Sequence, residues 1–171
     1  MGNFSKQPLQ ALLENLGKGY IGLHVEQGVP VLDRDLNLLN DLVQAMVRRI
    51  VSRYIGDGVA AGVEGFAVQA IPANNDFRIT AGGAGGGYCL VGGIEVFLGA
   101  NMNYGDQTDL PALSTPGPTQ PDPRVDRVYL DVWIEEVDGA ADADLLNPDD
   151  VGIQTSVRER PAWRVRVAEG L

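Results

Sequence analysis

The sequence predicts an α+β protein in which mostly antiparallel strands accompany one long helix and one short N-terminal helix. Two patterns lead to this prediction: an apolar pattern of helical period from about residue 34 to residue 55, and several short alternating segments after residue 59. The 171 residues, 44% of them hydrophobic, are enough for one domain with a core, or for one domain and an appendage. We expect residues 1–58 to hold the helices and residues 59–171 the β-rich part, within one compact unit.

The chain begins with a pattern typical of a short helix. Residues 4–16 carry four leucines at helical spacing, Pro8 suits the first turn, and Gly17 ends the pattern. The segment Tyr20–Val25 then alternates apolar with other side chains, which is the period of a half-buried strand. We therefore expect a helix, a strand and a turn before the long helix.

The long helix is the strongest local prediction. It should run from about Arg34 to Ile55, with Asp33 or Asp35 as its cap and Gly56 at its end. A rise of 1.5 Å per residue over about 22 residues gives a rod of about 33 Å, far longer than the average globular helix. Nine apolar side chains cover about half of its circumference. They are Leu36, Leu39, Leu42, Val43, Met46, Val47, Ile50, Val51 and Tyr54.

This apolar face is wider than an ordinary surface helix or a coiled-coil seam requires. The excess suggests that the helix contacts its own sheet and something else, for which a symmetric copy of the chain is the simplest candidate. A helix that is fully internal to the fold explains the same pattern. In the first interpretation, the self-association stripe consists of Leu39, Val43, Met46 and Ile50.

The second half of the chain has the rhythm of a sheet. Phe66–Ile71 and Phe77–Thr80 are typical of strands. Tyr88–Val91 and Ile94–Leu98 flank Gly92-Gly93, a pair that forms a two-residue hairpin because both turn residues can adopt positive φ.

Two loops separate the remaining strands. Residues 111–123 hold five prolines, too many for a strand that needs N–H donors, and are expected to form an extended surface loop or arm. Residues 138–150 form a second loop, rich in Ala and Asp. A flexible connector is also the expected form of Gly82–Gly87, because a strand follows it rather than the helix N-terminus that a phosphate loop requires.

The last two strands are predicted to pair. Residues 128–135 and 163–167 both alternate apolar with polar or charged side chains. If the strands are antiparallel neighbours, Asp131 and Glu135 lie across from Arg164 and Arg166, and each favourable pair adds about 0.2 to 1 kcal/mol. This pairing is a prediction of register.

The net charge of −10 is concentrated in one part of the chain. Residues 101–150 hold twelve acidic and two basic side chains, and the rest of the chain holds eleven of each. Such a surface repels phosphate, so we expect no nucleic-acid binding. A solvated surface explains the charge, and docking to a basic partner or collection of cations remains open.

Residues for catalysis or metal binding are scarce. His24 is the single histidine and Cys89 the single cysteine, and neither lies in a recognisable nucleophile turn. Asp33–Asn37 alternates oxygens as a calcium loop does, but Leu38 and Gln44 stand where such a loop needs glycine and glutamate. We therefore expect no enzyme, no cofactor and no metal. No apolar run or leader indicates membrane insertion or secretion.

Segments that lie far apart in the chain carry a family pattern. Gln27–Asn37 contains a Q-G and L-D-x-D opening, Val91–Ile94 a hairpin, and Tyr104–Pro111 a Y-x-x-Q-x-D-L-P loop. Tyr129–Trp133 is a Y-L-D-V-W strand and Trp163–Val167 a closing W-x-V-x-V strand. In this order, over most of its length, the chain resembles an uncharacterised N-terminal module of tail-associated proteins of bacteriophages and of phage-tail-like contractile injection systems.

The chain departs from that pattern at a few positions. Leu36 stands where the family usually has Trp, Gly92 where Asp is common, and Ile134–Glu136 where Glu-Arg-His is usual. The scaffold pattern stays intact, but the family's charged residues support no argument here. Because no catalytic motif accompanies the resemblance, it implies assembly rather than chemistry.

The resemblance implies a structural component of a phage tail or contractile injection particle, assembled in the cytoplasm and then part of the particle. It implies a homo-oligomer, with a trimer favoured because tail fibres are commonly trimeric. The Pro-rich arm and its acidic neighbours would contact other tail or injection-particle subunits. The alternative is a glycan- or receptor-binding tail module. Its ligand surface would include Tyr129, Trp133, Asp142 and Asp144.

Overall fold

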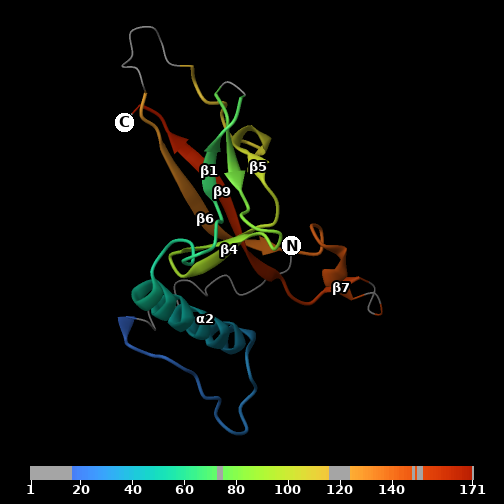
Figure 1. Cartoon of the computed structure of the whole chain (residues 1–171). Helices are drawn as coiled ribbons and strands as arrows, with labels where there is room; N and C mark the ends of the chain where they lie inside the picture. The colour runs from blue at the N-terminus through green and yellow to red at the C-terminus, as the bar shows by residue number, and fades with distance from the viewer. Residues whose placement is uncertain (1–16, 73–74, 116–123, 148, 150–151, 171) are drawn as a thin grey trace. The chain divides into compact units, whose positions relative to one another are not determined.

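The computed structural model describes residues 17–72, 75–115, 124–147, 149 and 152–170. Within these ranges, one long helix accompanies short antiparallel sheets, which confirms the α+β class with mostly β structure (Figure 1). The chain divides into two compact units. The first contains the residues up to Ile55 and Glu136–Arg158, and the second contains Gly56–Glu135 and Glu159–Leu171.

The long helix of the first unit forms as predicted. Helix α2 spans Asp33–Ile50 and continues as one π-helical segment, η1, over Val51–Ile55. The cap differs from the prediction, because Leu32 occupies the N-cap position and the Asp35 carboxylate accepts its backbone N–H at 3.4 Å. Gly56 follows the last helical residue with a φ of +85°, which is the usual role of glycine after a helix.

The segment before α2 contradicts one prediction. Tyr20–Val25 is not a strand, although its side chains alternate. A strand needs a neighbour to satisfy its backbone hydrogen bonds, and this segment pairs with none of the described strands. Its apolar residues stay on the surface instead, with Ile21 77% exposed and Val25 48% exposed. The helix predicted within residues 4–16 lies outside the described residues.

The rest of the first unit is a small hairpin with turns before it. The short 3-10 helix η3, Ala143–Leu145, precedes β7, Leu146–Asn147, which pairs with β8, Ile153–Gln154. The Gln154 side chain accepts the Gly139 N–H at 2.9 Å and so holds the start of the loop against its end.

The second unit contains a three-stranded antiparallel sheet and a hairpin. The sheet has the order β1-β2-β5, with β1 at Ala67–Ala70, β2 at Phe77–Thr80 and β5 at Met102–Asn103. The hairpin joins β3, Gly87–Val91, to β4, Ile94–Leu98. Its turn residues have φ values of +59° and +77°, so the predicted Gly92-Gly93 hairpin is confirmed.

The two longest described strands form a sheet of their own. Strand β6, Arg127–Val137, pairs with β9, Arg158–Ala168, and the two lie side by side in Figure 1. Both strands were predicted from their alternating side chains. The inward face of β9 reaches the core of the unit through Val165, which is 4% exposed.

The core of the second unit joins the β1-β2-β5 sheet, β4 and β9 around the 3-10 helix η2, Tyr104–Asp106. Its aromatic rings meet in pairs. Phe77 stacks on Tyr104, and Phe66 meets Trp163 edge to face, both with ring centroids 5.1 Å apart. The Trp163 indole N–H donates to the Phe97 carbonyl at 3.2 Å, so its polar atom is satisfied. The buried residues are Ile79, Ala81, Leu98, Tyr104 and Val165.

The glycine-rich run Gly82–Gly87 is a connector, and its last residue explains why glycine is needed. A Cβ at Gly87 would lie 2.6 Å from the Gly65 Cα and 2.7 Å from the Ala81 carbonyl oxygen. No side chain fits at that separation. Glycine at the end of this run therefore lets two backbone segments approach each other.

Candidate interaction surfaces

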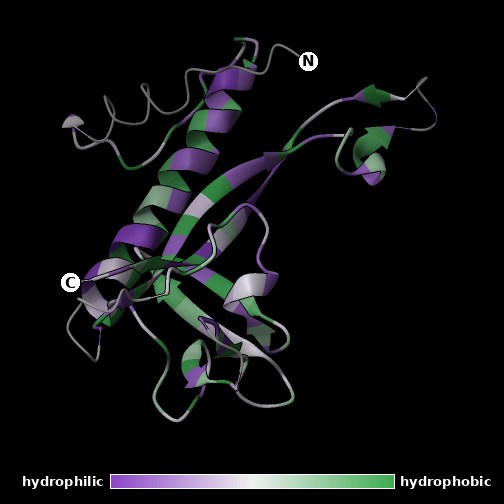
Figure 2. Ribbon diagram, turned by 90° about the horizontal axis from the view of Figure 1, so that it is seen from above, coloured by the Kyte–Doolittle hydropathy of each residue, from purple (hydrophilic) through white to green (hydrophobic). Residues whose placement is uncertain are grey.

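The surface of α2 carries a row of hydrophobic side chains, here called the apolar stripe. Its members recur at intervals of three and four residues, which places them on one side of the helix. Hydrophilic and hydrophobic residues accordingly alternate along α2 in Figure 2. The members are 39% to 59% exposed, and they are Leu36, Leu39, Val43, Met46, Val47 and Ile50. The four residues predicted as a self-association stripe are all among them.

Several side chains of α2 outside the apolar stripe are less exposed. Leu42 is the buried residue of the helix, at 2% exposure. Gln44 and Arg48 are half-buried one turn apart, and the Arg48 guanidinium donates to the Gln44 side-chain oxygen at 3.0 Å. The helix therefore leaves most of its large apolar side chains in contact with solvent. Contiguous apolar surface of this kind marks interaction sites in soluble proteins.

The second candidate surface is the charged face of the β6 and β9 pair. The Arg166 guanidinium lies 2.7 Å from the Asp131 carboxylate, so these two predicted partners are in contact. Arg164 instead lies over the Trp133 ring, 5.9 Å from its centroid, in cation–π geometry. The partner of Glu135 is Arg160, so the prediction that Glu135 pairs with Arg164 or Arg166 is wrong.

The Arg160 guanidinium donates a hydrogen bond to the Glu135 carboxylate. Arg164 makes a further contact, 3.4 Å, with the Asp109 carboxylate. Trp133 is half-buried beside this arginine, whereas Tyr129 on the same strand is 45% exposed. The two aromatic residues predicted for ligand binding thus share a strand, but their surroundings differ.

Tyr129 borders an open apolar hollow of about 120 Å³. Apart from the Tyr129 hydroxyl, its lining side chains offer no polar group that could orient a sugar. Trp133 is not among them. The lining residues are Phe66, Val68, Ile79, Val128, Tyr129, Leu130 and Val165.

The predicted acidic partners belong to the other unit. Asp142 and Asp144 are exposed in the loop before β7, and the Asp142 carboxylate accepts the Asp144 N–H at 3.1 Å. Asp138 likewise accepts the backbone N–H groups of Ala140 and Ala141, at 3.1 and 3.3 Å. The carboxylates here stabilise turns. Among the described residues, no three His, Cys, Asp or Glu side chains are grouped to hold a metal ion.

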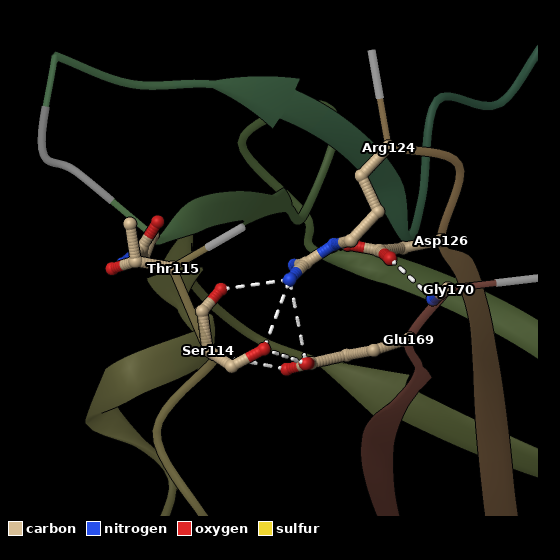
Figure 3. A network of polar contacts seen from close by, with 7 residues as sticks. Ser114, Thr115, Arg124, Asp126, Glu169 and Gly170 are labelled. Atoms are coloured by element: carbon tan, nitrogen blue, oxygen red, sulfur yellow. Dashed lines mark hydrogen bonds and ion pairs between the residues drawn. The ribbon is translucent and has the colours of Figure 1, made fainter. Parts of the chain in front are cut away.

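One polar cluster was not anticipated from the sequence. Figure 3 shows the Arg124 cluster, which joins Ser114, Arg124, Asp126 and Glu169. The Arg124 guanidinium donates to the Asp126 carboxylate at 2.7 and 3.0 Å and to the Ser114 carbonyl at 2.8 Å, and lies 3.4 Å from Glu169. The Ser114 N–H and hydroxyl both donate to Glu169, and the Gly170 N–H donates to Asp126 at 2.9 Å.

The electrostatics of the Arg124 cluster favour the charged forms of its members. The hydrogen bond from Arg124 lowers the pKa of Asp126, and the hydrogen bonds from Ser114 lower the pKa of Glu169. The cluster ties the two flanks of residues 116–123 to the end of β9. The one sequence signal for it was that Arg124 is one of two basic residues in the acidic stretch.

The Tyr104–Pro111 segment also stabilises the fold through side-chain hydrogen bonds to the backbone. The Gln107 side-chain amide accepts the Val165 N–H at 2.8 Å and donates to the Val165 carbonyl at 3.1 Å, so it substitutes for a neighbouring strand at the β9 edge. The Tyr104 hydroxyl donates to the Pro111 carbonyl at 3.2 Å, and Leu110 packs against the core. The residues of the Y-x-x-Q-x-D-L-P motif therefore have structural contacts.

The two candidate nucleophilic or basic side chains belong to different units. His24 is exposed in the first unit, and Cys89 is half-buried on β3 in the second. Burial raises the pKa of the Cys89 thiol, and the charge of Asp57 adds to the effect. At neutral pH the thiol form is therefore favoured, which is the less reactive form.

No protein-family model, curated protein or solved structure matches this chain. Helices long and apolar enough to cross a membrane do not occur in the described parts of the chain.

Proposed function

We propose that this chain is a structural component of a phage tail or of a phage-tail-like contractile injection particle. It acts as an assembly module that joins copies of itself and neighbouring subunits, and it enters the particle after synthesis and assembly in the cytoplasm. The proposal combines the resemblance of its sequence motifs with one structural observation. That observation is the apolar stripe on α2, whose side chains are 39% to 59% exposed.

Burial of the stripe in an interface is energetically favourable. Removing apolar surface from water contributes about 25 cal/mol per Å², so six large side chains supply several kcal/mol before the entropy of association is subtracted. Charged or polar residues on this side of α2 would avoid that exposure, but the sequence places Leu, Val, Met and Ile there. The stripe therefore has the composition of an interface core.

The motif residues support the same function from another direction. Gln107 bonds the edge of β9, Tyr104 bonds the Pro111 carbonyl, and Asp131 and Trp133 contact arginines across the sheet. These side chains hold the fold rather than present reactive groups. A scaffold with these properties suits a structural part of a particle better than it suits an enzyme.

Light scattering on the purified chain tests self-association. The unmodified chain should show a mass that is a multiple of 18.3 kDa at micromolar concentration. Val43→Gln combined with Met46→Gln should lower that mass to 18.3 kDa, because two polar amides would be buried at the interface centre. Val125→Gln with Ile153→Gln is the matched control, since both are exposed apolar residues outside α2, at 64% and 51%.

A second experiment tests the particle itself. The chain, carrying a small tag, should sediment with purified tail or injection particles from its native host, and the Val43→Gln, Met46→Gln variant should be depleted from them. A chain that never sediments with particles, or a wild-type monomer in light scattering, contradicts the proposal.

A further inference from the structure

We infer that the partner of the apolar stripe is a second copy of this chain whose α2 runs antiparallel to the first; this deepens the proposed function and rests on it. Two independent features of α2 carry the inference. One is the spacing of its exposed apolar residues, and the other is the distribution of its charges along the helix.

The spacing is the same read in either direction. Leu32, at 45% exposure, extends the row of apolar residues by one position before the helix. Val47 flanks this row, and successive intervals of four, three, four, three and four residues separate the members of the row itself. They are Leu32, Leu36, Leu39, Val43, Met46 and Ile50.

Alternating intervals of three and four residues are the spacing of a two-helix seam. In an antiparallel pair of copies, each residue of this row lies beside a residue of the same row on the partner copy. Leu36 then packs beside Met46 of the partner copy, and Leu39 beside Val43 of the partner copy. The ends close in the same register, with Ile50 beside Leu32 of the partner copy. Such an interface uses the same patch on both copies, as a twofold symmetric dimer requires.

The charges of the helix have a direction. Asp33, Asp35 and Asp41 lie in its first half, whereas Arg48 and Arg49 lie in its last turn. Arg34 is the exception in the first half, and it lies 3.7 Å from Asp35.

An antiparallel arrangement pairs these opposite ends. In the register of the seam, Asp35 and Arg49 of the partner copy flank the same side of the interface, and the pair occurs twice by symmetry. The helix dipoles also oppose each other favourably. A parallel bundle would instead gather the arginines of every copy at one end and align the dipoles. Charge therefore selects the antiparallel pair over a parallel dimer or trimer.

Cysteine crosslinking tests the orientation. Cys89→Ser supplies a background without native thiols, and Leu36→Cys and Met46→Cys are made on it singly. An antiparallel pair places residue 36 about 15 Å along the axis from its own copy, too far for a disulfide, which needs Cα atoms within about 7 Å. Mixing the two variants under mild oxidation should therefore yield a 36–46 dimer, and the Leu36→Cys variant alone should yield little.

Charge-reversal variants provide a second test of the helix orientation. Arg49→Glu should weaken dimerisation about tenfold or less, and Asp35→Lys in the same chain should restore it, whereas a parallel pair gains nothing from the second change. Arg34→Glu is the control, because this residue is 72% exposed and does not face the seam.

The outcomes separate the two proposals. A mass of twice 18.3 kDa with the 36–46 crosslink supports the antiparallel pair. A trimer, or a strong crosslink in Leu36→Cys alone, overturns this orientation and leaves the proposed self-association standing. A monomer at micromolar concentration overturns both.

Discussion

Gln107 and Val165 are joined through both ends of one side-chain amide. The amide oxygen accepts the Val165 N–H at 2.8 Å, and the amide nitrogen donates to the Val165 carbonyl at 3.1 Å. Val165 is 4% exposed, so its backbone groups depend on this partner at the edge of β9. A single side chain thus substitutes for a neighbouring strand.

Gln107→Leu should destabilise the second unit. Each buried backbone group left without a partner costs about 1–3 kcal/mol, and this change leaves two. Chemical denaturation followed by tryptophan fluorescence measures the loss. The stability of Gln107→Glu should fall between those of the wild type and Gln107→Leu. A carboxylate still accepts the Val165 N–H but cannot donate to the Val165 carbonyl.

Gln69→Leu is the control for this experiment, since Gln69 is exposed on β1. An equal loss of stability in Gln69→Leu and Gln107→Leu would contradict the role given to Gln107.

Gly87→Ala should destabilise the fold by about 1–3 kcal/mol, the usual cost of forcing extra atoms into a packed region. The added Cβ would lie 2.6 Å from the Gly65 Cα, and backbone cannot move away as a flexible side chain can. Thermal unfolding measures the effect. Gly83→Ala and Gly85→Ala, made in the same run of glycines, have nothing within 4 Å of the new Cβ and should be neutral or slightly stabilising.

Stability should fall in acid through the Arg124 cluster. Asp126 and Glu169 have folded-state pKa values below their ordinary values of 3.8 and 4.5. Their contribution is therefore fully present above the unfolded pKa values and is lost as the pH falls through the lowered folded values. Melting temperatures of the wild type between about pH 6 and pH 2.5 should show this loss.

Arg124→Gln should flatten the same acid dependence, because the hydrogen bond that lowers the Asp126 pKa is removed. Arg127→Gln, an exposed arginine three residues further along, serves as the control and should leave the slope unchanged. Parallel pH profiles for Arg124→Gln and the wild type would show that the cluster does not couple to folding.

Asp131 and Arg166 should show a small favourable coupling in a double-mutant cycle. Both side chains are about two-fifths exposed, at 42% and 40%, so solvent screens the pair. We expect about 0.2–1 kcal/mol from Asp131→Ala, Arg166→Ala and the double variant in urea denaturation. Asp131 with Arg160 is the control cycle, because Arg160 bonds Glu135. A coupling near zero for Asp131 and Arg166 would contradict this ion pair between β6 and β9.

Much of the local structure could be predicted because its causes lie within a few residues. The period of apolar residues predicted α2, and Gly56 marked its end. Gly92-Gly93 predicted the β3–β4 hairpin, because a two-residue turn of this kind needs positive φ at both positions and glycine adopts it readily. The alignment of the stripe residues was predictable for the same reason, since a helix places residues three and four apart on one side, but their exposure was decided by the tertiary structure.

The limits of prediction are visible at Tyr20–Val25 and at Glu135. Tyr20–Val25 has the alternating side chains of a strand but pairs with none of the described strands. Alternation shows which side chains share a face, but it does not show whether a neighbouring strand is present. Glu135 was assigned the wrong arginine. Alternation predicts which residues share a face, but it leaves the register open by two-residue steps.

By itself, the sequence determined the fold class, the long helix and the alignment of its apolar residues on one side, since propensity and periodicity act over one helical turn or one pair of strands. Only the tertiary structure decided the Gln107 contact with Val165 and the Arg124 cluster, which join residues 58 and 45 positions apart. Contacts at such separations depend on how the whole chain closes its loops around the core. No short-range pattern in the sequence encodes that closure.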